Sequence, residues 1–148
     1  VAVPVASEVL DHLQVVAWVP FFQTSTATSR TTLLTNIDIG DAVFNIARST
    51  QLVIALTTGD RDLLRNSMSD RLHQDQRLVE TPQCRAVFNR MLEMGAISSW
   101  LSGSGPTVAA FVERNDAAKI AELLSQEFPD GHAKVLSIDR LGLRRITV

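Results

Sequence analysis

The sequence predicts an α+β fold in which several helices pack over a mainly antiparallel sheet. Short apolar runs bounded by proline or glycine indicate strands, and apolar residues at helical spacing indicate amphipathic helices. Along the chain the order is strand, several helices, hairpin, helix and hairpin, which favours an α+β sandwich. With 148 residues, of which 45% are hydrophobic, the chain can bury a core as one domain.

The first third of the chain is predicted to hold a strand, a polar loop and a long helix. The apolar run 13–19 indicates a buried strand that ends at Pro20. Residues 21–36 contain six Thr and two Ser, whose side chains compete for backbone hydrogen bonds, so we expect a loop that faces a ligand. Asp38 is a suitable N-cap for a largely buried helix that ends at Gly59.

The middle of the chain contains two further predicted helices, separated by a polar stretch. Asp60 is expected to cap a helix over residues 62–68, and residues 69–80 are predicted to form a polar segment. Thr81 and Pro82 predict the N-cap and first residue of another helix, which Gly95 ends.

The last third of the chain is predicted to be mainly strands around one helix. Asn115 or Asp116 is expected to cap that helix, which ends at residues 129–131. The strands are predicted over residues 96–101, 106–112, 132–138 and 143–148.

Composition excludes several classes of protein. The chain has 14 Lys and Arg against 16 Asp and Glu, and no basic cluster is denser than Arg144–Arg145, so a nucleic acid is not an expected partner. The longest apolar runs, such as 15–19 and 52–56, are far shorter than the roughly 20 residues of a membrane span. The lone Cys84 cannot form an internal disulfide, which favours a reducing compartment, and we expect the cytoplasm.

The loop from Ser102 to Thr107 is the strongest local signal. Two glycines and two serines between apolar runs can leave backbone N–H groups free to face a phosphate. A hairpin turn that simply needs positive φ explains the same residues equally well. No lysine follows as in a P-loop, and a strand follows where a Rossmann turn needs a helix.

Two arginines in polar segments are candidate ligands for an anion. Arg30 and Arg77 can each hold a carboxylate or phosphate through two hydrogen bonds, although a solvated surface arginine is the simpler reading. His73 is a candidate proton carrier, with an ordinary loop histidine as the alternative. Cys84 is expected to be a buried, inert thiol. No metal site is predicted, because the following carboxylates are spaced as helix caps and surface charges: Asp60, Asp62, Asp70 and Asp75.

Four segments together resemble the homoserine kinase family of the GHMP kinase superfamily. In order and spacing the resemblance covers nearly all of this chain, but only about the second half of the family's length. It implies the C-terminal, ferredoxin-like sandwich domain of a two-domain kinase, with residues 1–148 as one domain and the N-terminal ATP-binding domain absent. The chain does not begin with Met, which fits this expectation. The segments are residues 25–30 (Ser-Thr-Ala-Thr-Ser-Arg), 41–45 (Asp-Ala-Val-Phe-Asn), 70–77 (Asp-Arg-Leu-His-Gln-Asp-Gln-Arg) and 101–107 (Leu-Ser-Gly-Ser-Gly-Pro-Thr).

The resemblance also implies an activity and a set of binding residues. The family transfers the γ-phosphate of ATP to the hydroxyl of L-homoserine, a step in threonine biosynthesis. Arg30 and Arg77 would hold the substrate carboxylate, with Thr26 nearby. No catalytic residue is assigned within the chain. Beside the phosphates, the supporting loop residues would be Ser102, Gly103, Ser104, Gly105 and Thr107.

The missing N-terminal half carries the family's ATP loop and magnesium ligand. ATP and Mg²⁺ are therefore expected in the full-length enzyme but not on this fragment, which should be inactive alone. A homodimer is left open. The sequence departs from the family at Asp75-Gln76, where Pro-Tyr is frequent, and the added negative charge can alter the surroundings of Arg77.

Two other functions fit the same sequence. The first is another GHMP small-molecule kinase, such as diphosphocytidyl-methylerythritol kinase, which shares the glycine loop but needs no paired arginines for a carboxylate. The second is a free-standing α+β module that binds a small ligand or a partner without chemistry.

Overall fold

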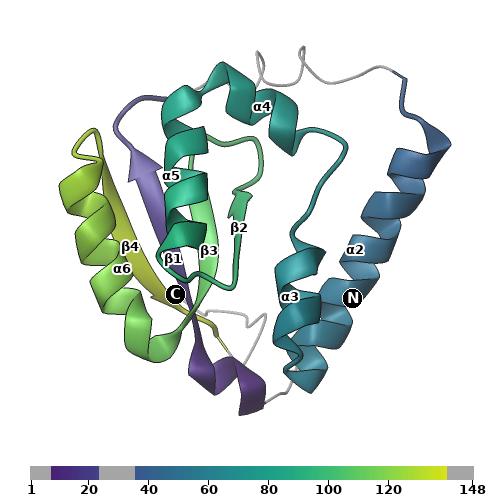
Figure 1. Ribbon diagram of the computed structural model, residues 1–148, viewed down its shortest axis with the longest axis horizontal. Coiled ribbons are helices and arrows are strands. Elements are labelled where there is room, and N and C mark those ends of the chain that lie inside the picture. Colours follow the sequence, from purple (N-terminus) through teal and green to yellow (C-terminus); the bar gives the residue numbers. More distant parts are fainter. Residues whose placement is uncertain (1–7, 24–35, 140–148) are drawn as a thin grey trace, which may run out of the picture.

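The computed structural model describes residues 8–23 and 36–139, and its centre is a four-stranded antiparallel sheet (Figure 1). The strand order is β2-β3-β1-β4, so β1 is central and pairs with both β3 and β4. The predicted hairpin forms, with Ser98 opposite Phe111 and Leu101 opposite Val108. The strands are β1 (Leu13–Pro20), β2 (Ser98–Leu101), β3 (Val108–Glu113) and β4 (Gly131–Ser137).

Helices cover both faces of the sheet. In Figure 1, α5 and α6 lie on one side, while α2 and α3 lie together on the other, and α4 crosses near one end. The antiparallel sheet with packed helices confirms the predicted fold class. The helices are the 3-10 helix η1 (Glu8–His12), α2 (Ile39–Thr58), α3 (Arg61–Ser67), α4 (Gln74–Glu80), α5 (Pro82–Glu93) and α6 (Arg114–Glu127).

Side chains from alternate positions of β1 build a separate core on each face of the sheet. Val16 and Trp18 point to the α5 and α6 side, where Trp18 is fully buried. The Trp18 and Phe128 rings pack edge to face, with their centroids 6.3 Å apart. Leu13 and Val15 point to the opposite side, among residues of η1, α2 and α3. Full burial of one large apolar side chain contributes about 1.5–3 kcal/mol, so both layers are held mainly by this packing.

The helix caps follow the sequence closely. Asp38 accepts a hydrogen bond from the Gly40 N–H (2.7 Å) and begins α2, and Asp60 accepts from the first turn of α3. Gly59 ends α2 in the left-handed conformation (φ 81°), which a glycine adopts at little cost. Thr81 precedes α5, but its hydroxyl bonds to the Arg77 carbonyl and not to the helix, so the predicted side-chain cap is wrong.

Three other expectations about the helices were wrong. Residues 74–80, expected within a polar segment, form α4, because Leu78 anchors them in the core. Helix α6 begins at Arg114 after Glu113, so neither Asn115 nor Asp116 caps it. Helix α2 is not largely buried: Ala55 is its only buried residue, because α2 packs along one side only.

The predicted strand over residues 143–148 lies outside the described residues, as do Thr26 and Arg30. Within the described ranges, no helix combines the length and the apolar character needed to cross a membrane.

Candidate functional site

The glycine loop between β2 and β3 is a tight turn that bonds to itself. The Ser102 N–H donates to the Thr107 carbonyl (2.8 Å), and the Gly105 N–H donates to the Ser102 carbonyl (3.0 Å). Gly103 and Gly105 have φ values of 58° and 79°, a left-handed conformation that glycine adopts readily. At Gly105 a Cβ atom would also lie 3.0 Å from the Leu101 side chain.

The loop leaves two adjacent backbone donors unused. Among the residues that the structure describes, the N–H groups of Gly103 and Ser104 donate to no other group. Successive unpaired N–H groups of this kind are typical of an anion-binding turn. The geometry therefore shows the hairpin and the free amides together, and the two readings of the sequence do not exclude one another.

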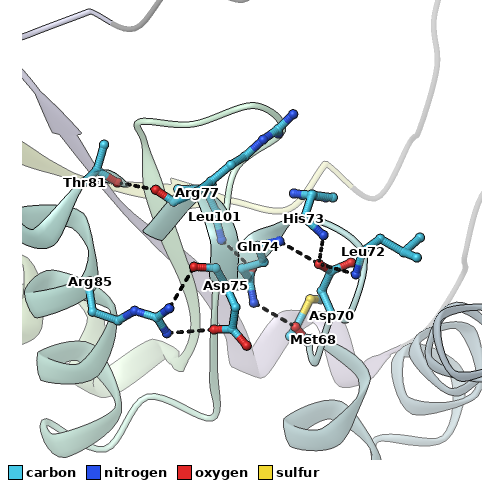
Figure 2. A network of polar contacts seen from close by, with 10 residues as sticks. All are labelled: Met68, Asp70, Leu72, His73, Gln74, Asp75, Arg77, Thr81, Arg85 and Leu101. Carbon is cyan, nitrogen blue, oxygen red and sulfur yellow. Dashed lines mark hydrogen bonds and ion pairs between the residues drawn. The ribbon is translucent and has the colours of Figure 1, made fainter. Parts of the chain in front are cut away.

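Side chains of α4 and α5 form hydrogen bonds with the glycine loop and its flanking strand at three points. The buried Gln74 accepts a hydrogen bond from the Leu101 N–H through Oε1 (2.8 Å; Figure 2). Arg77 donates from Nη1 to the Gly103 carbonyl (3.1 Å), and Cys84 donates from Sγ to the Pro106 carbonyl (3.2 Å). The loop is thus fixed by the helices that follow the 70–73 turn.

Arg77 is the one sequence-predicted substrate residue that lies within the described ranges, and it stands at the edge of the glycine loop. Besides its contact with Gly103, it lines a small pocket with Glu80, Ser104 and Pro106. Thr26 and Arg30 fall outside the described residues, so their distance from Arg77 stays a prediction.

Asp70 organises the turn that leads into α4 (Figure 2). Its carboxylate accepts hydrogen bonds from the N–H groups of Leu72, His73 and Gln74. It also accepts a hydrogen bond from the Asn45 side-chain amide (2.5 Å). Burial, the largest influence, raises the pKa of Asp70, but the hydrogen bonds from Gln74, His73 and Asn45 outweigh it and lower the pKa overall. The carboxylate is therefore held ionised as a fixed structural anion.

The first turns of α2 brace the same turn from the other side. Asn45 accepts a hydrogen bond from the Arg71 N–H (3.0 Å) while donating to Asp70. The Arg71 guanidinium lies 4.0 Å from the centre of the Phe44 ring and 3.6 Å from an Asp41 oxygen. The 41–45 and 70–74 segments, far apart in sequence, are therefore one local unit.

A cavity of about 290 Å³ opens over this unit. Buried Nδ1 of His73 has no hydrogen-bond partner within the described part of the chain. The lining residues are Asp41, Asp70, Arg71, Leu72, His73, Asp75 and Gln76.

The negative charge of Asp75 is directed toward α5. Arg85 donates to the Asp75 carboxylate (2.8 Å) and also to the Asp75 carbonyl (3.0 Å). The Asp75 carboxylate therefore forms an ion pair with Arg85 of α5.

Cys84 is buried, as the sequence predicted, and the sequence did not reveal its contact with the loop. Burial raises the pKa of the Cys84 thiol, against a smaller lowering by the Thr81 side chain, so the thiol stays protonated at neutral pH. A protonated thiol can donate its weak hydrogen bond to Pro106. The residue supports the loop as a structural group.

Sequence reasoning missed the roles of Gln74 and Asn45. Both are amides that bridge segments distant in sequence: Gln74 ties α4 to Leu101, and Asn45 ties α2 to Asp70. Single-sequence patterns carry no signal for such bridges. The only sequence signal is that each residue lies within a motif segment, Asn45 in 41–45 and Gln74 in 70–77.

Comparison with known proteins places the chain among homoserine kinases and related GHMP kinases. The family model described as "GHMP kinases C terminal" matches residues 52–130. A homoserine kinase of Moorella thermoacetica is 43% identical over 121 residues, covering 82% of this chain and 40% of that protein. A homoserine kinase of Wolinella succinogenes is 36% identical over 135 residues, covering 91% and 46%.

A solved structure extends the match to the fold. The crystal structure of homoserine kinase from Cytophaga hutchinsonii superposes with a TM-score of 0.82 at 26% identity, covering 95% of this chain and 45% of that one. The chain thus spans less than half the length of these relatives. On the family match, and with the antiparallel sheet and glycine loop in place, this chain belongs to the GHMP kinase C-terminal family.

Proposed function

We propose that this chain is the C-terminal part of a homoserine kinase, which transfers the γ-phosphate of ATP to the hydroxyl of L-homoserine. One observation carries the proposal: Arg77 lies 3.1 Å from the Gly103 carbonyl, beside the free amides of the glycine loop. A group suited to a carboxylate thus stands next to a turn suited to a phosphate. Curated relatives named homoserine kinase support the choice of substrate.

Each binding residue has a role in this proposal. Arg77, together with Arg30 and Thr26 of the 24–35 segment, holds the carboxylate of homoserine. Each charged hydrogen bond contributes roughly 1.5–3 kcal/mol, so two guanidinium groups suffice to orient a small amino acid. The N–H groups of Gly103 and Ser104 flank the phosphates, with Ser102, Gly105 and Thr107 shaping the turn.

ATP and Mg²⁺ would be held mainly by the N-terminal part that the relatives possess. Within residues 8–23 and 36–139 no three His, Cys, Asp or Glu side chains come together as a metal-binding group. Because the family's ATP loop lies in that N-terminal part, we expect the 148 residues to be inactive alone: phosphoryl transfer depends on positioning the nucleotide and on neutralising its charge. The enzyme would act in the cytoplasm, in threonine biosynthesis.

The proposal is tested by restoring the missing part. The segment of the M. thermoacetica kinase that lies ahead of the matched region is fused upstream of this chain, and ADP release is measured with L-homoserine, with L-serine and without an amino acid. We expect release that depends on homoserine, and none from the 148 residues alone. ADP release that is indifferent to homoserine, from a folded fusion, would contradict the proposal.

Arg77→Ala in the same fusion addresses the carboxylate site. We expect the KM for homoserine to rise about 10- to 100-fold, while the KM for ATP changes less than about 3-fold. Arg65→Ala is the matched control, since Arg65 pairs with Asp62 on the surface of α3, and both KM values should stay within about 2-fold. An equal loss for both substrates would remove Arg77 from the homoserine site.

A further inference from the structure

One side of α2 is apolar and exposed along the whole helix. Ile39 is 81% exposed, Ile46 is 67% exposed and Val53 is 56% exposed. With a turn every 3.6 residues, the spacing of 4, 3, 4, 3 and 4 residues keeps one row on the same side of the helix. We call this surface the open face of α2, and it consists of Ile39, Val43, Ile46, Thr50, Val53, Ile54 and Thr57.

The open face carries no charge. The only charged residues of α2 are Asp41 and Arg48, which the helical spacing places on the opposite side. There Asp41 approaches Arg71, and Arg48 donates to Gln51 (2.6 Å). A helix side that faces water normally carries charged and polar residues, so the composition of this one is typical of an interface.

The hydroxyl groups on and beside the open face are already satisfied. Thr50 donates to the Ile46 carbonyl (3.2 Å), and Thr57 donates to the carbonyls of Val53 and Ile54. These bonds stay within the helix, so each threonine can turn its methyl group toward a neighbour. A partner could therefore cover the face without leaving a buried donor unpaired.

The opposite side of α2 is firmly seated, so the open face is a preformed surface. Ala55 is buried, and Leu52 and Leu56 pack with it against α3 and η1. Figure 1 shows α2 and α3 side by side at one edge of the fold. The first turn also contributes Asp41 to the cavity over the 70–73 turn.

We propose that the open face of α2 is the docking surface for the N-terminal part of the kinase. More than half of each relative's length lies outside the match, and the matching family model describes the C-terminal portion. A partner of that size can cover a helix of 20 residues. This inference rests on the proposed function, because it takes its occupant from the kinase relatives.

The test compares one substitution in two settings. Ile46→Lys is placed in the 148-residue chain and in the fusion described above, and the thermal midpoint of each is measured. We expect a fall of about 5 °C or more in the fusion, where the lysine would be buried, and less than about 2 °C in the shorter chain. Leu92→Lys, an exposed apolar position on α5, is the control and should act equally in both settings.

The outcomes separate this inference from the proposed function. If the fusion is inactive but Ile46→Lys still lowers its thermal midpoint more than that of the shorter chain, the docking surface is supported and the proposed kinase function is rejected. If the fusion is active but Ile46→Lys lowers the thermal midpoint equally in the fusion and in the shorter chain, only the docking surface is rejected. Sedimentation of the shorter chain is the second measurement: a monomer supports the proposal, whereas a dimer that Ile46→Lys dissociates puts a second copy on the face and overturns it.

Discussion

Helices α6 and α2 flank opposite faces of one sheet, but only α6 has a surface suited to water. The inner side of α6 is apolar, and its outer positions carry charged residues such as Arg114, Lys119 and Glu122. Near its end, Glu127 accepts two hydrogen bonds from Arg90 of α5 (2.7 and 2.9 Å). The outer side of α2 carries isoleucine, valine and threonine at the corresponding places.

The difference shows that packing onto a core explains only one side of a helix. Both helices bury apolar side chains on their inner sides: α6 buries Ala117, Ile120, Ala121 and Leu124, and α2 buries Ala55, with Leu52 and Leu56 packed beside it. What distinguishes them is the composition of the side that the domain itself does not use. An apolar outer side on a helix that is packed onto its domain indicates a further protein contact, whereas a charged outer side indicates a surface that faces solvent.

The sharpest test of this contrast is truncation on each side. Leu124→Ala, on the inner side of α6, should lower the free energy of unfolding of the 148-residue chain by about 2–5 kcal/mol, because Leu124 is fully buried. Ile46→Ala should change it by less than about 0.5 kcal/mol. Urea unfolding followed by circular dichroism gives both values. A comparable cost at both positions would mean that the open face is already covered.

The second test concerns a contact that the domain completes internally. Gln74→Leu leaves the Leu101 N–H without its acceptor and should cost about 1–3 kcal/mol of unfolding free energy. Because both partners belong to this chain, the cost should be the same in the shorter chain and in the fusion. Gln126→Leu, on the exposed side of α6, is the control and should cost less than about 0.5 kcal/mol. A negligible loss at Gln74 would show that water replaces the amide.

Acid unfolding examines the joint between α2 and α4. The folded pKa of Asp70 lies below its ordinary value of 3.8, so its contribution is present above that pH and is lost as the pH falls through the folded pKa. Asp70→Asn should therefore lower stability at pH 7 by about 1 kcal/mol and flatten the decline below pH 3.8. If the unfolding free energy falls equally steeply below pH 3.8 in the Asp70→Asn variant and in the unchanged chain, Asp70 is not responsible for the loss of stability in acid.

The smallest expected effect is at a pair exposed to solvent. Asp75 and Arg85 join α4 to α5, and their side chains are 78% and 32% exposed. A double-mutant cycle with Asp75→Ala and Arg85→Ala should give a coupling of about 0.5–1 kcal/mol, which falls as salt is added. A coupling above about 2 kcal/mol would mark the pair as part of the rigid support of the loop.

Much of the fold could be predicted because its signals are local. The caps at Asp38 and Asp60, the left-handed Gly59 and the hairpin around the glycine loop depend on a few neighbouring residues. Helix α4 was missed because its seven residues include only one buried apolar side chain, Leu78, which leaves no apolar periodicity to detect.

The site was less predictable, since its contacts join distant segments. The motif segments pointed to Arg77 and the glycine loop, yet the bonds from Gln74 and Asn45 follow from tertiary placement alone. The exposure of α2 was missed for a related reason. An apolar helix in a sequence looks the same whether its second side meets its own domain or another polypeptide.

The pattern of hydrogen bonding in the glycine loop has a consequence for what it can attract. The carbonyls of Ser102, Gly103, Pro106 and Thr107 are all engaged, whereas the amides of Gly103 and Ser104 have no acceptor within the described ranges. Two adjacent amides without an acceptor suit an anion. Since peptide amides do not titrate, the anion affinity that we propose for this turn should depend little on pH between mildly acidic and mildly alkaline solution.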